Sequence, residues 1–156
     1  MYETKHLRIL ERDGWEYVER KRAREAVAVI AVTDAGELVL TEQYRRAVDA
    51  RVIDLPAGLV EEHPPAETAK RELEEETGFT CEEVEFLARG PTSPGLTSEL
   101  VSFYRARGVR RVGPGGGIGD EEITVHLVPL RDIDRWLRSR GGVLIDVKVW
   151  AGLRLM

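Results

Sequence analysis

Residues 65–79 read PAETAKRELEEETGF and carry the strongest helix signal in the sequence. Pro65 suits the first turn of a helix, where its missing N–H is not needed, and Gly78 is typical of a helix end. The residues between them are mostly Glu, Lys, Ala and Leu, which are good helix formers. The sequence therefore predicts an α-helix from Pro65 to Thr77.

Three glutamates gather along one edge of this predicted helix. Glu72 and Glu76 are four residues apart, and Glu75 follows Glu72 by three residues. Like charges at this spacing destabilise a helix by about 0.2–0.5 kcal/mol per pair, unless a cation lies between them. Carboxylate oxygens without converging His or Cys select Mg²⁺ or Mn²⁺, and Mg²⁺ favours substrates that carry phosphate. An acid-rich helix face is also commonly just solvated, and the pair alone leaves that alternative open.

The wider string around these glutamates resembles the signature of an enzyme family. Gly58, a spacer and residues 71–79 (RELEEETGF) follow the order of the Nudix hydrolase box. The resemblance implies an α/β Nudix fold, in which a mixed β-sheet is sandwiched between helices and preceded by an N-terminal β-hairpin. It also implies that Glu72 and Glu76 are metal ligands, and that Glu75 is an auxiliary ligand and catalytic residue.

The spacing within this box departs from the family in one respect. Arg71 follows Gly58 by 71 − 58 = 13 residues, one fewer than is usual in the family. The supporting glutamate of the spacer is replaced by Pro64, and Glu62 is its nearest stand-in. Because that glutamate mostly supports the loop in the family, the departure bears on loop stability and substrate fit more than on metal binding.

Two further segments resemble one branch of the family, the ADP-ribose and nucleotide-sugar pyrophosphatases. Residues 55–61 (LPAGLVE) resemble a segment in which an alanine carbonyl completes the metal site, which gives Ala57 that role by resemblance. Residues 93–99 (SPGLTSE) resemble a Pro-Gly loop beside the terminal sugar, which implies that Gly95 and Glu99 bind substrate. Taken alone, the Pro-Gly pair favours a type II turn.

A glycine-rich segment that leads into acidic residues is the predicted source of the catalytic base. Residues 113–119 (GPGGGIG) hold five glycines, which predicts a mobile loop rather than a regular element. A flexible segment can bring a carboxylate onto bound substrate. By resemblance, Glu121 is the expected base or additional metal ligand, and Glu122 is the second candidate. Some branch members carry the base at the position of Gly119, and a solvated acidic loop is the ordinary alternative.

Four residues match positions with which the branch holds its substrate. Arg45 and Arg20 match arginines that grip the diphosphate, a task suited to the bidentate guanidinium. Trp15 and Glu16 match an aromatic and acidic pair that holds the purine. Surface ion pairs are the ordinary alternative for Arg45 and Arg20, and hairpin packing is the ordinary alternative for Trp15. In the branch the N-terminal hairpin is shared across a twofold dimer, so the resemblance also implies a homodimer.

The rest of the chain predicts strands around the helix and two helices towards the end. Residues 27–32 and 38–44 are apolar runs on either side of a turn signal at residues 34–36, which predicts a hairpin. Further strands are predicted at residues 15–24, 51–55, 84–89, 100–106 and 123–127, and further helices at residues 132–140 and 147–155. We divide the chain into an N-terminal hairpin or dimerisation extension, residues 1–24, and a Nudix hydrolase domain, residues 25–156.

Composition narrows the classes of function. The length of 156 residues fits one ordinary domain. The net charge of −5 gives no overall positive field, so we expect neither nucleic acid nor an anionic membrane as partner. Cys81 is the only cysteine, which excludes an intrachain disulfide and fits a reducing compartment. The sequence shows no apolar run typical of a secretion signal or a membrane span, so we expect a cytoplasmic protein.

The predicted reaction follows from the resemblance. It is the Mg²⁺-dependent (or Mn²⁺-dependent) hydrolysis of the diphosphate bond of ADP-ribose or a related nucleoside diphosphate sugar, giving a nucleoside monophosphate and a sugar phosphate. A GDP-mannose-type hydrolase is the alternative within this class, because residues 115–123 also resemble that subgroup. A non-catalytic Nudix domain that senses ADP-ribose and a plain interaction domain are the alternatives from other classes. The complete set of glutamates argues against the sensing domain.

Overall fold

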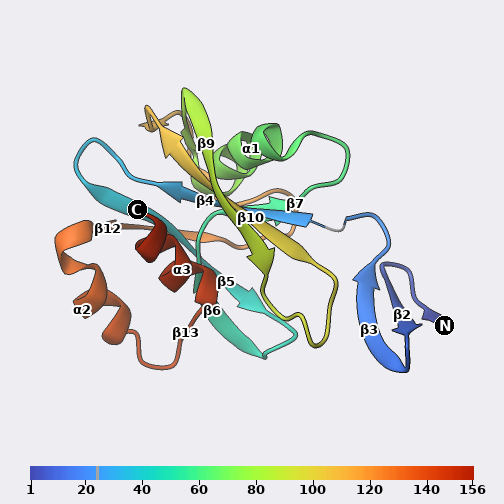
Figure 1. Ribbon diagram of the computed structural model, residues 1–156. Helices are drawn as coiled ribbons and strands as arrows, with labels where there is room; N and C mark the ends of the chain where they lie inside the picture. The colour runs from blue at the N-terminus through green and yellow to red at the C-terminus, as the bar shows by residue number, and fades with distance from the viewer. Residues whose placement is uncertain (24) are drawn as a thin grey trace.

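The computed structural model describes residues 1–23 and 25–156, and Arg24, the end of the predicted N-terminal extension, lies outside the described residues. The N-terminal strands form an antiparallel sheet of their own, here called the N-terminal sheet. Its strands, in spatial order, are β1 (Tyr2–Glu3), β2 (Leu7–Arg12) and β3 (Trp15–Arg20). The predicted hairpin is confirmed, and Figure 1 shows the sheet beside the main body of the protein.

The first main sheet contains a strand that is buried on both faces. In spatial order the strands are β7 (Ala57–Leu59), β4 (Glu25–Ala31), β10 (Leu100–Arg107) and β9 (Glu83–Pro91). β4 and β10 are parallel, whereas β7 and β9 pair antiparallel with them. Ala28 and Ile30 of β4 face one part of the core, and Val27 and Val29 face the other. Burial on both faces explains why β4 is a continuous apolar run.

The second main sheet contributes to the part of the core that Ala28 and Ile30 of β4 face. In spatial order its strands are β12 (Thr124–Pro129), β5 (Glu37–Arg45), β6 (Ala50–Asp54) and β13 (Leu144–Ile145). β5 is antiparallel to both of its neighbours, and β13 is parallel to β6. A small two-stranded sheet pairs β8 (Phe79–Thr80) with β11 (Arg110–Arg111). Because β8 follows the first helix directly, this small sheet fixes the end of that helix to the later part of the chain.

The helices cover the sheets from two sides. They are α1 (Pro65–Thr77), α2 (Ile133–Arg138) and α3 (Val147–Leu155). α1 agrees with the prediction at both ends, and Gly78 closes it in the left-handed region at φ 73°, which glycine adopts without strain. A 3₁₀ turn over Leu130–Asp132 precedes α2, so the helix predicted at residues 132–140 is present but shorter.

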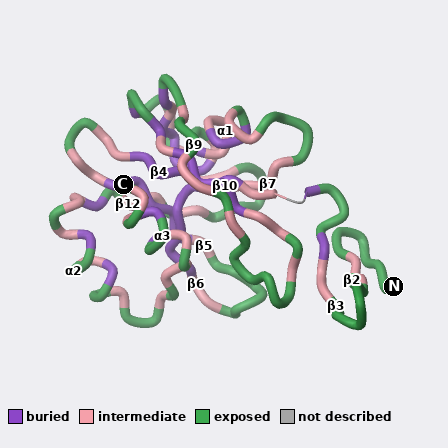
Figure 2. The backbone as a smooth tube through the Cα atoms, viewed as in Figure 1, coloured by how far each residue is buried: buried purple, intermediate pink, exposed green. Residues whose placement is uncertain are grey.

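The apolar core has two parts. One lies among the two main sheets, α2 and α3 and includes Ile30, Ile53 and Val149, and the other lies under α1 and includes Val29 and Leu73. Figure 2 shows the buried residues concentrated in the central strands, and Figure 1 shows α1 on one side of them and α3 on the other. The predicted α/β architecture, with mixed β-structure between helices, is confirmed, and its strands are divided between sheets.

The predicted hairpin of residues 27–32 and 38–44 is wrong. β4 and β5 lie in different sheets and are joined by an isolated bridge between Val32 and Leu38. β4 is apolar on both faces and pairs at both edges, with β7 and β10, so the turn marks a crossing between sheets. The two- and three-residue strands β1, β7, β8, β11 and β13 were not predicted, and β7 matters most because it carries Ala57.

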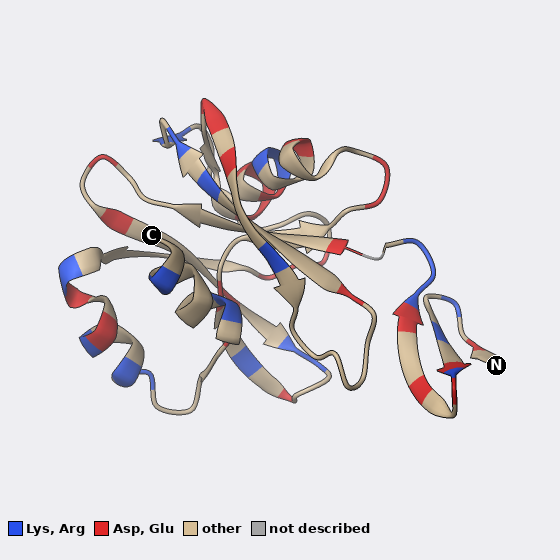
Figure 3. Cartoon of the chain, in the orientation of Figure 1, with Lys and Arg blue, Asp and Glu red and all other residues tan. Residues whose placement is uncertain are grey.

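Two surface properties bear on possible partners. None of the helices in the described part of the chain is long and apolar enough to cross a membrane. Figure 3 shows Lys and Arg interspersed with Asp and Glu along α1, α2 and the N-terminal sheet. Each of these elements therefore carries both positive and negative side chains.

Candidate functional site

Glu76 is a buried carboxylate on the inner face of α1. It follows the core residue Leu73 by one turn and is only 8% exposed. Its Oε2 accepts a hydrogen bond of 3.0 Å from the backbone N–H of Ala57. Burial raises the pKa of Glu76 to about 8, because surroundings shielded from water penalise the charged form. When ionised, a buried carboxylate of this kind favours a compensating cation.

Glu72 lies one turn before Glu76 and packs against β7. Its side chain is 16% exposed and accepts a 2.8 Å hydrogen bond on Oε1 from Nη2 of Arg71. Burial raises the pKa of Glu72 as well. Gly58 lies directly against this carboxylate, since a Cβ at position 58 would stand 2.1 Å from Cδ of Glu72. The glycine of the sequence motif is therefore what leaves room for Glu72 over the strand.

The structure brings Glu72, Glu76 and Ala57 together where β7 meets α1, here called the β7–α1 edge. Glu75 lies nearby on the helix, with Oε2 3.7 Å from Nε of Arg71. Across residues 1–23 and 25–156, no three His, Cys, Asp or Glu side chains converge on one metal position. The donors nonetheless fit a hard divalent ion, because the carboxylates of Glu72 and Glu76 are both largely shielded from solvent and only glycine at position 58 leaves room for Glu72.

The glycine-rich segment, residues 113–119, is attached to the end of α1. The N–H groups of Gly116 and Gly117 donate to the carbonyls of Glu76 and Glu75, at 2.8 and 3.1 Å. These bonds satisfy carbonyls that have no partner inside the helix. A Cβ at Gly115 would stand 2.2 Å from the backbone of Thr77, so the contact needs glycine there. The predicted lack of regular structure is confirmed, whereas the predicted mobility stays a prediction.

The two candidate bases follow this segment and are both exposed. Oε2 of Glu121 accepts a 3.0 Å hydrogen bond from the N–H of Ile118. Burial is the main cause of the raised pKa of Glu72, and the charge of Glu121 adds to it. The carboxylate of Glu121 therefore acts on the β7–α1 edge electrostatically, whereas the choice between Glu121 and Glu122 as base stays a prediction.

Arg45 lies at the exposed end of β5 and acts on the same edge. While burial raises the pKa of Glu76, the positive charge of Arg45 works in the opposite direction. Arg45 is therefore close enough to influence the carboxylate and exposed enough to reach a bound anion. The other predicted diphosphate ligand, Arg20, is engaged elsewhere, because its Nε lies 2.5 Å from Oε2 of Glu99.

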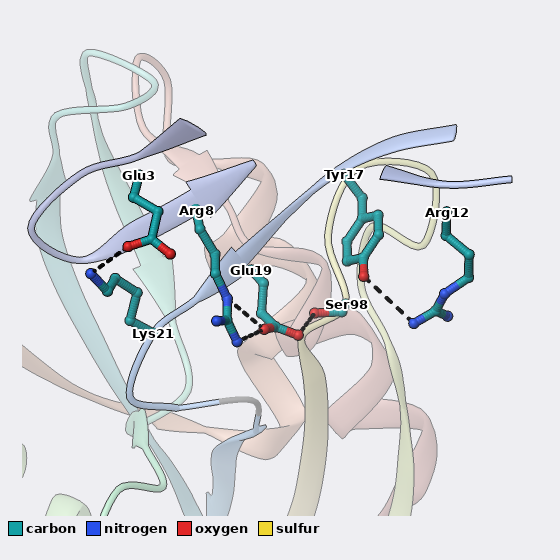
Figure 4. Close-up of polar contacts among 7 residues, drawn as sticks. All are labelled: Glu3, Arg8, Arg12, Tyr17, Glu19, Lys21 and Ser98. Atoms are coloured by element: carbon teal, nitrogen blue, oxygen red, sulfur yellow. Dashed lines mark hydrogen bonds and ion pairs between the residues drawn. The ribbon is translucent and has the colours of Figure 1, made fainter. Parts of the chain in front are cut away.

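The N-terminal sheet contacts the loop of residues 93–99. Nε1 of Trp15 donates to the carbonyl of Gly95 at 3.3 Å, and the N–H of Val18 donates to the carbonyl of Leu96 at 2.8 Å. Figure 4 shows Glu19 reaching both Arg8 and Ser98. Four predicted substrate residues are thus brought together as two pairs, Trp15 with Gly95 and Arg20 with Glu99. Glu16 lies opposite Glu11 in the sheet and is exposed.

Sequence reasoning missed a buried charged pair beside the site. Asp54 ends β6, three residues before Ala57, and is buried with its carboxylate 3.0 Å from Nζ of Lys148. An acid at the end of the apolar run VIDLP is a signal that could have drawn attention to Asp54. No signal in the sequence joins it to Lys148.

Comparison with known proteins places this chain in one family. Residues 22–145 match the NUDIX domain, and the chain belongs to the Nudix family. It is similar over 97% of its length to the crystal structure of an ADP compounds hydrolase, with a TM-score of 0.72, 19% sequence identity and 89% of that chain covered. The predicted Nudix fold is therefore confirmed.

Three relatives in sequence have names that bear on function. A methanol dehydrogenase activator from Bacillus methanolicus is 42% identical over 67% of this chain and 57% of its own length. An ADP-ribose pyrophosphatase from Bacillus subtilis (strain 168) is 35% identical, over 74% of this chain and 63% of its own length. A GDP-mannose pyrophosphatase from Enterobacter sp. (strain 638) is 33% identical, over 77% of this chain and 70% of its own length. The chain thus spans about three fifths of the length of the first two relatives.

Proposed function

We propose that this protein hydrolyses the diphosphate bond of ADP-ribose or a related nucleoside diphosphate sugar, releasing a nucleoside monophosphate and a sugar phosphate. The observation that carries the proposal is the β7–α1 edge, where Glu72 lies against Gly58 and Glu76 is buried beside Ala57. Relatives named ADP-ribose pyrophosphatase and GDP-mannose pyrophosphatase support the substrate class, because both names describe a sugar joined to a nucleoside diphosphate.

Nudix pyrophosphatases generally use divalent metal ions, and we propose Mg²⁺ or Mn²⁺ here. Glu72, Glu76 and the Ala57 carbonyl would hold the ion, with Glu75 and Glu121 as additional ligands. When bound, such an ion offsets charge on the diphosphate and lowers the pKa of a water molecule. The carboxylate of Glu121, Glu122 or Glu75 would accept the proton of the attacking water.

Arginine and aromatic side chains would position the substrate in this proposal. Arg45 would hold diphosphate oxygens by charge-assisted hydrogen bonds, and its electrostatic effect on Glu76 supports a place beside the metal. Trp15 and Glu16 would hold the base. Gly95, Glu99 and Arg20 would lie on the sugar and diphosphate side, where Arg20 must exchange its bond to Glu99 for one to substrate.

The test is a substrate panel with and without Mg²⁺, read as phosphate released after phosphatase treatment. We expect Mg²⁺-dependent cleavage of ADP-ribose to AMP and ribose phosphate. A higher kcat/KM for GDP-mannose would select the GDP-mannose-type hydrolase, which is favoured by relatives of that name that match over 70% and 78% of their own length. Binding of ADP-ribose without cleavage would overturn the enzyme and identify a sensing domain.

We also propose that the protein acts as a homodimer in the cytoplasm. The N-terminal sheet exposes Tyr2, Leu7, Ile9 and Trp15, and association with a second copy would remove part of this apolar surface from water. A single buried cysteine fits a reducing compartment. Light scattering after size exclusion should give twice the mass of one chain, and a monomer at micromolar concentration would contradict the dimer.

A further inference from the structure

Lys148 lies between two carboxylates, one of which belongs to Asp54, three residues before Ala57 of the β7–α1 edge. Its Nζ is 3.0 Å from Oδ2 of Asp54 and 2.8 Å from Oδ2 of Asp146. The side chain of Lys148 is 16% exposed and that of Asp54 is 6% exposed. A buried ion pair of this kind often stabilises a fold no better than apolar packing would. The way in which this ion pair positions the backbone is therefore more informative than its contribution to stability.

Asp54 begins the segment that leads to the proposed metal ligand Ala57. Its Oδ1 accepts from the N–H of Leu55 at 2.8 Å, and its carbonyl accepts from Oγ1 of Thr41 at 3.3 Å. At the other end of the segment, Ala57 donates its N–H to Glu76. Residues 54–57 are therefore a short tether with the Lys148 ion pair at one end and the acidic edge of α1 at the other.

α3 holds this ion pair in a fixed place. Asp146 caps the helix by accepting from the N–H of Lys148 at 2.9 Å, and its own N–H donates to the carbonyl of Ile53 at 2.9 Å. One turn further along, a Cβ at Gly152 would stand 2.9 Å from Cδ1 of Leu55, so the helix lies close against the tether. Lys148 therefore reaches Asp54 from a helix that is itself fixed to β6.

We propose that Lys148 is a positioning residue for the metal site, which holds the backbone of residues 54–57 through Asp54 and so sets the place of Ala57 beside Glu76. The inference rests on the proposed function, because it concerns the same metal edge. Lys148 lies on α3 and acts through Asp54 on the backbone, without contacting substrate. Outer partners that orient metal ligands change metal affinity by about 10–100-fold when they are removed.

The test measures Mn²⁺ binding directly, by the loss of the free-ion EPR signal on titration, beside the thermal midpoint of unfolding. We expect Lys148→Met to weaken Mn²⁺ binding by about 10–100-fold. Lys148→Arg keeps a charge that can span both carboxylates and should stay within a few-fold of the unmodified protein. Arg154→Met removes an exposed cation from the same helix and is the matched control, with no change expected.

A double variant distinguishes an effect on the position of Ala57 from an effect on the stability of the fold. Lys148→Met alone leaves the buried carboxylate of Asp54 without its cation and is expected to lower the thermal midpoint of unfolding. The double variant Asp54→Asn with Lys148→Met removes this unpaired carboxylate charge, so the thermal midpoint should recover while Mn²⁺ binding stays weak. Recovery of both properties, or unchanged binding in Lys148→Met, would overturn the positioning role and leave the proposed function intact. Absence of Mn²⁺ binding in the unmodified protein would overturn both.

Discussion

The β7–α1 edge and the N-terminal sheet are built in opposite ways. At the edge, Glu76 is almost fully buried, and the side chain of Glu72 fills the space over Gly58. In the N-terminal sheet, Trp15 is 62% exposed and its indole N–H bonds the backbone of the 93–99 loop. Figure 2 shows the same contrast between the buried central strands and the N-terminal strands, which are mostly exposed or partly exposed.

The buried edge suits the chemical step, whereas the exposed N-terminal sheet suits recognition of the substrate. Ligands of a metal ion must keep their geometry to within a fraction of an ångström, which requires packing on all sides. A side chain that stacks on a base tolerates small displacements and needs only an exposed face. Substitutions at the edge should therefore change kcat, whereas substitutions in the N-terminal sheet should change KM.

The largest effect is expected at Glu76. Glu76→Gln removes the charge that binds the metal but keeps the shape and the bond from Ala57. Because a bound metal contributes several kcal/mol of transition-state stabilisation, kcat should fall by about 10³-fold or more while the fold is retained. Steady-state kinetics and circular dichroism would measure both. Glu74→Gln changes an exposed acid on the same helix and should leave kcat unchanged; an active Glu76→Gln protein would rule out this metal site.

The packing of Gly58 gives the next largest effect. In Gly58→Ala the new methyl group would overlap Cδ of Glu72, so the carboxylate must move. A displacement of about 1 Å at a reacting group can lower the rate by about 10²-fold, and we expect a loss of that size in kcat. Gly90→Ala is the control, because a Cβ there meets nothing within 4 Å. Equal rates for the two variants would show that the edge is less tightly packed than the structure indicates.

Substitutions in the N-terminal sheet should change KM rather than kcat. Stacking of a base on an aromatic ring contributes about 1–3 kcal/mol, so Trp15→Ala should raise KM for ADP-ribose by about tenfold and change kcat little. Trp15→Phe retains a ring and should recover most of the affinity. A loss in kcat as large as that of Gly58→Ala would remove the distinction between the two regions.

The two regions also differ in how far the sequence predicted them. Helix α1 was predicted at both ends because Pro65 and Gly78 act locally, and the acidic edge followed from residue spacing on that helix. The pairing of Arg20 with Glu99 joins residues 79 positions apart, and nothing local to either residue indicates it. The predicted hairpin of residues 27–32 and 38–44 was wrong for the same reason, because an apolar run does not specify which strands become its neighbours.

The pH dependence of stability is the smallest expected effect, and Glu76 should be its main source. Its pKa is near 4.5 in the unfolded chain and is raised by burial to about 8 in the folded protein. Between these values the folded protein keeps a proton that the unfolded chain has released, so the free energy of unfolding falls as pH rises from about 4.5 through about 8. The thermal midpoint of the metal-free protein should therefore be a few degrees lower at about pH 9 than at about pH 6. Glu76→Gln should reduce this difference to the part that the raised pKa of Glu72 contributes, and Mg²⁺ should reduce it because the ion binds the ionised carboxylate. The same pH slope in Glu76→Gln would show that other groups set it, and that the buried edge is no more sensitive to pH than the exposed sheet.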